Sequence, residues 1–168
     1  LLSVHTIGES AFFYCISLYS IYISNFVTEI PSNAFYNCLN LTQVLGFKSI
    51  QIIHTEAFHS CHRLSTLVFP ESLTTLHTGA FAASGLKEVY LKKQLKIIPS
   101  NCFANCLDLE TVIVEDGVEA ILTGAFKNCG NLINVTLSRS LISIEDNAFF
   151  ECFRVEHVQF SELTNLGN

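Results

Sequence analysis

Residues 121–137 read ILTGAFKNCGNLINVTL, and the pattern of this stretch returns along the whole chain. Each repeat carries a small residue before a phenylalanine, a cysteine three residues after it in most copies, and aliphatic residues on both sides. The phenylalanine recurs at steps of 23, 23, 23, 22, 23 and 23 residues, at Phe12, Phe35, Phe58, Phe81, Phe103, Phe126 and Phe149. A repeat this short cannot bury its own apolar face and must stack on its neighbours. The pattern therefore predicts a solenoid in which one repeat forms one turn, here called a rung.

Two parts of the repeat predict two kinds of backbone. The Leu-x-x-Val-x-Leu segment alternates apolar residues and is rich in β-branched ones, which predicts a short strand. Stacked rungs place such strands side by side, about 4.8 Å apart, as a parallel sheet on one face. The Ala-Phe-x-x-Cys segment has apolar residues three apart, which favours a helical or 3₁₀ turn on the opposite face. We predict an α/β repeat solenoid of about seven rungs of 22–23 residues, forming a single domain over residues 1–168.

The repeated pattern I-x-x-x-A-F-x-x-C-x-x-L-x-x-V-x-L resembles the BspA-like, or treponemal-type, leucine-rich repeat, from about residue 4 to residue 160. The resemblance implies a surface-exposed or secreted solenoid of bacteria or parasitic protists that acts in adhesion or protein binding. The fourth rung departs from the pattern, because Ser84 replaces the cysteine and Gly85 alone separates it from Leu86. The chain begins without Met and part-way into a repeat, so we expect it to be an excerpt of a longer solenoid.

Composition excludes some classes of function. A net charge of −6 argues against nucleic acid, because a phosphate-binding surface needs a basic stripe. Residues 10–28 carry no charge and could be taken for a membrane span, but their apolar residues keep the repeat register, so we interpret them as the first rung. Six of the seven cysteines share one repeat position, which predicts a buried column of free thiols; an occasional bridge, or one from Cys102, is the alternative.

One repeat position gathers charges of alternating sign. Stacking would align seven residues along one edge, six of them charged with signs that alternate from Lys48 to Glu162: Asn25, Lys48, Glu71, Lys93, Asp116, Arg139 and Glu162. Adjacent columns place Lys92 over Glu115 and Lys96 over Glu119. We interpret this column as a ladder of weak ion pairs that penalises a slipped register, and the alternative is a charged docking strip.

The sequence contains few residue patterns typical of catalytic, phosphate-binding or metal sites. Ser, His and Asp residues stand in no nucleophile-elbow pattern, and a glycine-rich phosphate loop is absent. Histidines cluster in sequence at His54, His59 and His62, with His77 stacked over His54 by the repeat; they could share zinc, but exposed polar turns explain them more simply. We therefore predict no enzyme, no metal and no cofactor. Two N-x-S/T glycosylation sequons begin at Asn40 and Asn134.

The outward positions of the predicted strands give the candidate binding surface. The residue between the two inward positions of each strand points to solvent, and five consecutive rungs place an apolar or aromatic residue there. The candidate contact residues are Tyr22, Leu45, Val68, Tyr90, Ile113 and Thr136, with Gln159 continuing the column and Phe47 flanking it. The competing explanation is that such residues simply suit a strand.

We expect a non-enzymatic protein-binding or adhesion module that contacts a protein or glycoprotein. An intracellular scaffold or regulatory repeat segment is the alternative, and a spacer with no recognition face is a third.

Overall fold

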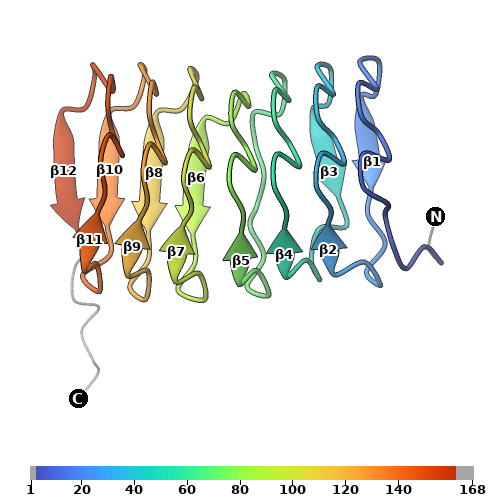
Figure 1. Ribbon diagram of the computed structural model, residues 1–168, viewed down its shortest axis with the longest axis horizontal. Coiled ribbons are helices and arrows are strands. Elements are labelled where there is room, and N and C mark those ends of the chain that lie inside the picture. The colour runs from blue at the N-terminus through green and yellow to red at the C-terminus, as the bar shows by residue number, and fades with distance from the viewer. Residues whose placement is uncertain (1–2, 162–168) are drawn as a thin grey trace.

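A computed structural model of the chain describes residues 3–161, and it is a flat solenoid whose rungs stack along one axis (Figure 1). The first face carries β1 (Ser20–Tyr22), β3 (Gln43–Leu45), β6 (Glu88–Leu91), β8 (Thr111–Val114), β10 (Asn134–Leu137) and β12 (His157–Phe160). The second face carries β2 (Glu29–Ile30), β4 (Ile52–Ile53), β5 (Thr75–Leu76), β7 (Ile97–Ile98), β9 (Ala120–Ile121) and β11 (Ser143–Ile144). All strand pairs are parallel. The parallel sheet of short strands is therefore confirmed.

The repeated phenylalanines form a continuous stack through the core. Neighbouring rings lie 5.1–5.6 Å apart with interplanar angles of 5–10°. The five inner rings of the stack, from Phe35 to Phe126, are fully buried. Each ring therefore covers the faces of its neighbours, which is how a repeat too small to have its own core acquires one.

The prediction of helical turns, and with it the α/β class, must be corrected: the described residues contain no helix. In each rung the residues two before and two after the phenylalanine adopt positive φ, as at Asn33 and Asn37, both at 56°. Such left-handed residues end a helix after one turn. Alternate amides of the segment bond instead to the next rung, as where the Phe35 N–H donates to the Ala57 carbonyl at 2.8 Å, and the amides between them close local turns, as where the Tyr36 N–H donates to the Asn33 carbonyl at 3.1 Å. The recurrent Asn and Gly at these positions were a sequence signal for turns.

The first-face sheet is interrupted at one rung. β1 and β3 pair with each other, β6, β8, β10 and β12 form a separate sheet, and residues 65–70 between them carry no strand. On the second face the break falls between β5 and β7. Each face thus has six strands within residues 3–161, and the count of seven rungs is not confirmed.

The interruption coincides with local changes in the repeat. Gly85 packs so closely on the preceding rung that an added Cβ would lie 2.0 Å from the His62 carbonyl oxygen. Phe69 fills an inward position that Ile23, Leu91, Val114 and Leu137 hold in other rungs, and its ring meets Phe81 edge-on at 5.3 Å. A shortened loop and a larger core residue displace this rung from the spacing that strand pairing requires.

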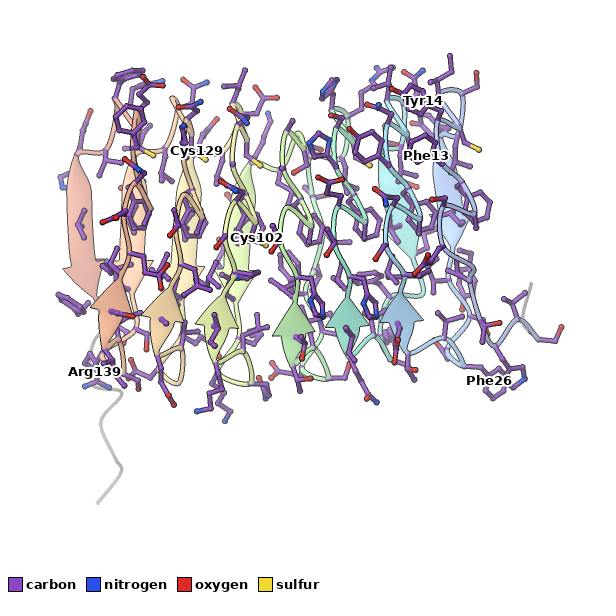
Figure 2. All side chains as sticks on the ribbon, viewed as in Figure 1. Phe13, Tyr14, Phe26, Cys102, Cys129 and Arg139 are labelled. Atoms are coloured by element: carbon purple, nitrogen blue, oxygen red, sulfur yellow. The ribbon has the colours of Figure 1, made fainter. Side chains whose placement is uncertain are left out.

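The cysteine column is buried from Cys38 to Cys129, and Cys129 lies toward the upper left in Figure 2. Its thiols donate to phenylalanine carbonyls of the rung before, at 3.1–3.2 Å, from Cys38, Cys61, Cys106, Cys129 and Cys152. Cys15, at the first rung, is exposed. Burial raises the pKa of the Cys38 thiol to about 11. The column therefore acts as packing with weak hydrogen bonds, as the repeat position predicted.

Residues 10–28 include β1 and the turn before it, in agreement with their interpretation as the first rung. Across residues 3–161 we find no helix with the length and apolar character needed to cross a bilayer.

Candidate functional site

The strand register builds a column of outward residues, called the stripe: Tyr22, Leu45, Val68, Tyr90, Ile113 and Thr136. Tyr22 pairs with Leu45, Tyr90 with Ile113, and Ile113 with Thr136, so these residues are neighbours across rungs. The side chains of Tyr22, Leu45 and Tyr90 are 43%, 50% and 45% exposed, and Val68 is 85% exposed. The stripe is therefore an accessible apolar and aromatic surface, divided at Val68 by the interruption of the sheet.

A polar margin accompanies the stripe on one side. Its residues are neighbours across paired strands: Ser20 pairs with Gln43, and Glu88, Thr111, Asn134 and His157 pair in turn. The Tyr90 hydroxyl donates to Glu88 at 3.0 Å, and this hydrogen bond raises the pKa of Tyr90. This hydrogen bond orients the ring of Tyr90, while its two neighbours in the stripe, Val68 and Ile113, remain accessible. Such an arrangement suits an apolar contact patch with a polar rim.

Phe47 does not flank the stripe, because it points into the core and is only 6% exposed. Its ring lies edge-on to Phe58 at 6.1 Å. The cause is Gly46, which stands where other rungs have an inward aliphatic residue and adopts φ 75°. At this left-handed φ an added Cβ would lie 2.0 Å from the Ile23 carbonyl oxygen, so only glycine fits here, and the next side chain, Phe47, turns inward. Phe47 is therefore unavailable to a partner.

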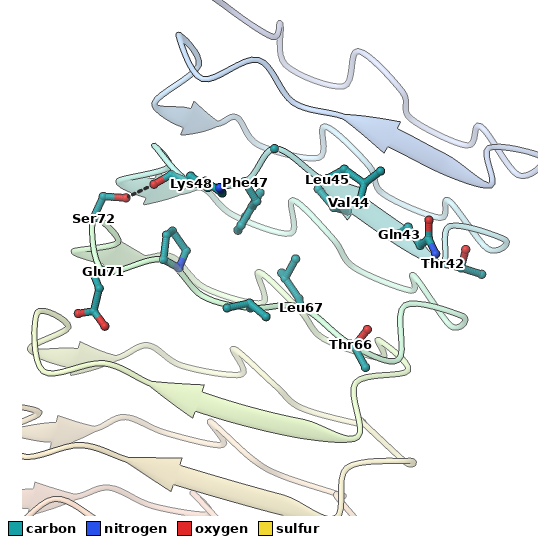
Figure 3. Close-up of a pocket in the computed structure, with 13 residues that line it drawn as sticks. Thr42, Gln43, Val44, Leu45, Phe47, Lys48, Thr66, Leu67, Glu71 and Ser72 are labelled. Atoms are coloured by element: carbon teal, nitrogen blue, oxygen red, sulfur yellow. Dashed lines mark hydrogen bonds between the residues drawn. The ribbon is translucent and has the colours of Figure 1, made fainter.

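The interruption opens a groove on the first face, which the repeat pattern did not predict. Its volume is about 840 Å³, and it lies between β3 and residues 66–72 (Figure 3). The lining is largely apolar, and includes Val44, Leu45, Leu67, Val68 and Pro70. Val44 and Leu67 hold inward positions, yet both are only partly buried, whereas Val89 at the same position is fully buried. The one-residue shortening at Gly85 was the sequence signal for this irregularity.

The charged edge agrees only in part with the predicted ladder. Arg139 and Asp116 form a close, multiply bonded ion pair, and Arg139 lies at the lower edge in Figure 2. Hydrogen bonds from Arg139, and then from Ser161, hold the pKa of Asp116 well below its usual range. Glu162, the last member of the predicted ladder, lies outside the described residues. The predicted ion pair between neighbouring members of this column is thus confirmed for one step of the ladder, Asp116 with Arg139.

The adjacent columns pair as predicted. Lys92 contacts Glu115 at 3.0 Å, and Lys96 contacts Glu119 at 3.1 Å. The hydrogen bond to Glu115 raises the pKa of Lys92. Glu71, however, contacts Lys92 at 3.6 Å instead of a residue of its own column. The side chains of these surface pairs are 28–68% exposed, so each pair contributes about 0.2–1 kcal/mol at most.

The histidines separate into two places. His54 stacks on His77 with ring centroids 5.0 Å apart, as predicted, and its Nε2 lies 3.0 Å from a Glu29 carboxylate oxygen. His59 stacks instead on Tyr36 at 4.7 Å, on the turn segment. Among residues 3–161, no three His, Cys, Asp or Glu side chains are grouped to hold a metal ion.

Of the two glycosylation sequons, Asn40 is engaged: its side-chain amide donates to the Ile16 carbonyl at 2.8 Å. Asn134 lies in β10 beside the stripe and is exposed.

The comparisons with known proteins decide the family. The family described as the BspA type leucine rich repeat region matches residues 2–110 and 96–168, in six copies. The chain belongs to this family. Leucine-rich repeat proteins are generally non-enzymatic modules for protein interaction. No curated protein matches the chain.

Solved structures of bacterial proteins share the fold. A leucine-rich repeat protein from Bacteroides ovatus is 31% identical with a TM-score of 0.85, over 92% of this chain and 40% of its own. A leucine rich cell surface protein from Faecalibacterium prausnitzii is 31% identical with a TM-score of 0.84, over 91% and 42%. The T. pallidum leucine-rich repeat protein is 28% identical with a TM-score of 0.78, over 88% and 69%. This BspA-type chain thus spans less than half the length of the first two.

Proposed function

We propose that this BspA-type chain is a non-enzymatic adhesion module that binds a protein or glycoprotein through the stripe on its first face. The single observation behind the proposal is the column of accessible apolar and aromatic side chains that runs across consecutive rungs. Monomeric proteins rarely expose contiguous apolar patches without using them. Tyr22 and Tyr90 are the proposed anchors, because tyrosine combines large area with a hydroxyl group.

The cell surface is the proposed location. Its support is the description of the Faecalibacterium relative as a cell surface protein, together with the family to which this chain belongs. Antibody labelling of intact cells, compared with permeabilised ones, tests this location. Labelling only after permeabilisation would favour an intracellular scaffold instead.

Substitution within the stripe tests the contact surface. The variant Tyr22→Ser, Tyr90→Ser, Ile113→Ser would be compared with wild type for binding to immobilised purified matrix proteins and glycoproteins. We expect at least a tenfold loss of affinity for the bound protein, since two anchors of about 1–2 kcal/mol each are removed. Ile97→Ser is the matched control, because Ile97 is similarly exposed, at 49%, but lies on the second face in β7.

Folding of each variant is checked by circular dichroism and thermal unfolding before binding is measured. Equal affinity of the folded stripe variant and wild type would remove the first face as the contact surface. Equal loss in the stripe variant and in Ile97→Ser would point to a nonspecific effect of lost apolar area, and would also count against the proposal.

A further inference from the structure

The groove beside the stripe carries an inference that rests on the proposed function and makes its partner more specific. We propose that the groove between β3 and residues 66–72 binds an extended peptide segment of the partner. This segment presents an aliphatic side chain to the opening between Val44 and Leu67. It also places an acidic group beside Lys48. Three independent features of the groove lead to this occupant.

The first feature is unpaired backbone. The Ile23 N–H donates to the Leu45 carbonyl at 2.7 Å, so Leu45 turns its peptide groups toward β1. Since successive strand residues turn their peptide groups to opposite sides, Val44 turns its N–H and C=O toward the groove. Within residues 3–161, β3 pairs only with β1, and no strand pairing joins it to residues 65–70. An extended chain is the partner that matches such a strand edge.

The second feature is an incomplete apolar cover. Val112, at the same repeat position as Val44, is fully buried under its neighbours, but Val44 and Leu67 are left partly accessible. Val68 beside them is the most exposed residue of the stripe. The groove volume of about 840 Å³ is within the range of sites that enclose a ligand of several residues. An aliphatic side chain entering here would complete a core layer that the chain itself leaves open.

The third feature is a positive charge without an internal partner. One end of the groove, at the left in Figure 3, is bounded by the Ser72 hydroxyl, which donates to the Lys48 carbonyl at 3.1 Å. Glu71, which the ladder would place against the Lys48 ammonium, bonds to Gln94 at 3.1 Å and to Lys92 instead. No ion pair of Lys48 is found among residues 3–161. An acidic group on the bound peptide supplies the complementary charge.

Synthetic peptides test the inference directly. The probe is the capped, fluorescein-labelled peptide Thr-Val-Thr-Val-Glu-Glu, measured by fluorescence anisotropy against the whole chain. Two matched peptides replace the glutamates by lysines or methylate alternate backbone nitrogens. We expect the acidic peptide to bind about fivefold more tightly than the lysine peptide, and the N-methylated peptide to lose binding, because it cannot pair with β3.

Two charge reversals separate the groove from general electrostatics. Lys48→Glu is expected to cancel the preference for the acidic peptide, while Lys48→Arg retains it. Lys93→Glu is the matched control, because Lys93 is exposed at the same repeat position as Lys48 but follows the paired strand β6. We expect this control to bind the acidic peptide as wild type does.

The inference is overturned if the N-methylated peptide binds as well as its parent, or if Lys93→Glu has the effect of Lys48→Glu. Failure of every peptide to bind also overturns it. If Ile113→Ser still weakens binding to a matrix protein in that case, the proposed function stays in place. If peptide binding persists while Ile113→Ser leaves matrix binding unchanged, the groove stands and the stripe fails. The two proposals can therefore fail separately.

Discussion

Replacing Phe81 by alanine should show how far the phenylalanine stack holds the solenoid together. Phe81 is fully buried, with the rings of Phe58 and Phe103 at 5.2 and 5.6 Å on its two faces and Phe69 edge-on at 5.3 Å. A Phe-to-Ala change in such a site costs about 3–5 kcal/mol, from lost transfer free energy and the remaining cavity. We expect a loss near the middle, about 4 kcal/mol in the free energy of unfolding.

The same change at the end of the stack is the matched comparison. Within residues 3–161, Phe149 stacks on one ring only, that of Phe126 at 5.2 Å, and it is partly exposed. Its replacement by alanine should therefore cost about half as much, roughly 2 kcal/mol. At about 2–4 °C per kcal/mol for a chain of this size, the midpoint should fall by about 8–16 °C for the central variant and by about half of that for the terminal one.

Urea and thermal unfolding followed by circular dichroism measure both values. Because rungs interact mainly with their neighbours, the central variant can also unfold in two steps, which would itself locate the damage in the middle of the stack. A loss below about 1 kcal/mol for Phe81→Ala, or a loss no larger than that of Phe149→Ala, would refute the argument that the stack carries the core.

Three further outcomes can be checked on the same protein. Gly85→Ala should destabilise it by about 1–3 kcal/mol, since the new Cβ would lie 2.0 Å from a backbone oxygen; Gly130→Ala, with open space around it, should change the unfolding free energy by less than about 0.5 kcal/mol, and equal effects would contradict the packing argument. The pKa of Asp116 is lower in the folded state than in the unfolded state, so its stabilisation is full above the unfolded pKa of about 3.9 and is lost as the pH falls further. Acid titrations of unfolding should then show a steeper fall below about pH 4 for wild type than for Asp116→Asn, and parallel curves would rule this out. A thiol reagent at pH 8 should label exposed Cys15 first, while Cys61, whose pKa burial raises, should react only after denaturant is added; early labelling of Cys61, read by mass spectrometry, would show that the core opens readily.

The repeat period allowed much of the architecture to be predicted without coordinates. It aligned the phenylalanines, the cysteines and the outward strand residues into columns, and those columns appear in the structure. The stripe was predicted for the same reason, because strand alternation assigns Tyr22 and Tyr90 to the outer surface. The helical turns were not correctly predicted, since a spacing of three also fits two successive turns, and the Asn and Gly positions that distinguish them were not used.

The sequence by itself determined the stacking, because one repeat translated along an axis places equivalent residues over one another whatever their partners are. Only the tertiary structure decided where that regularity fails. The inward turn of Phe47 depends on the left-handed backbone at Gly46, packed against the Ile23 carbonyl, and the open groove depends on whether residues 65–70 can meet β3 and β6 at pairing distance at once. Such outcomes are set by the volumes of side chains from several rungs together, which no periodicity within a single rung specifies.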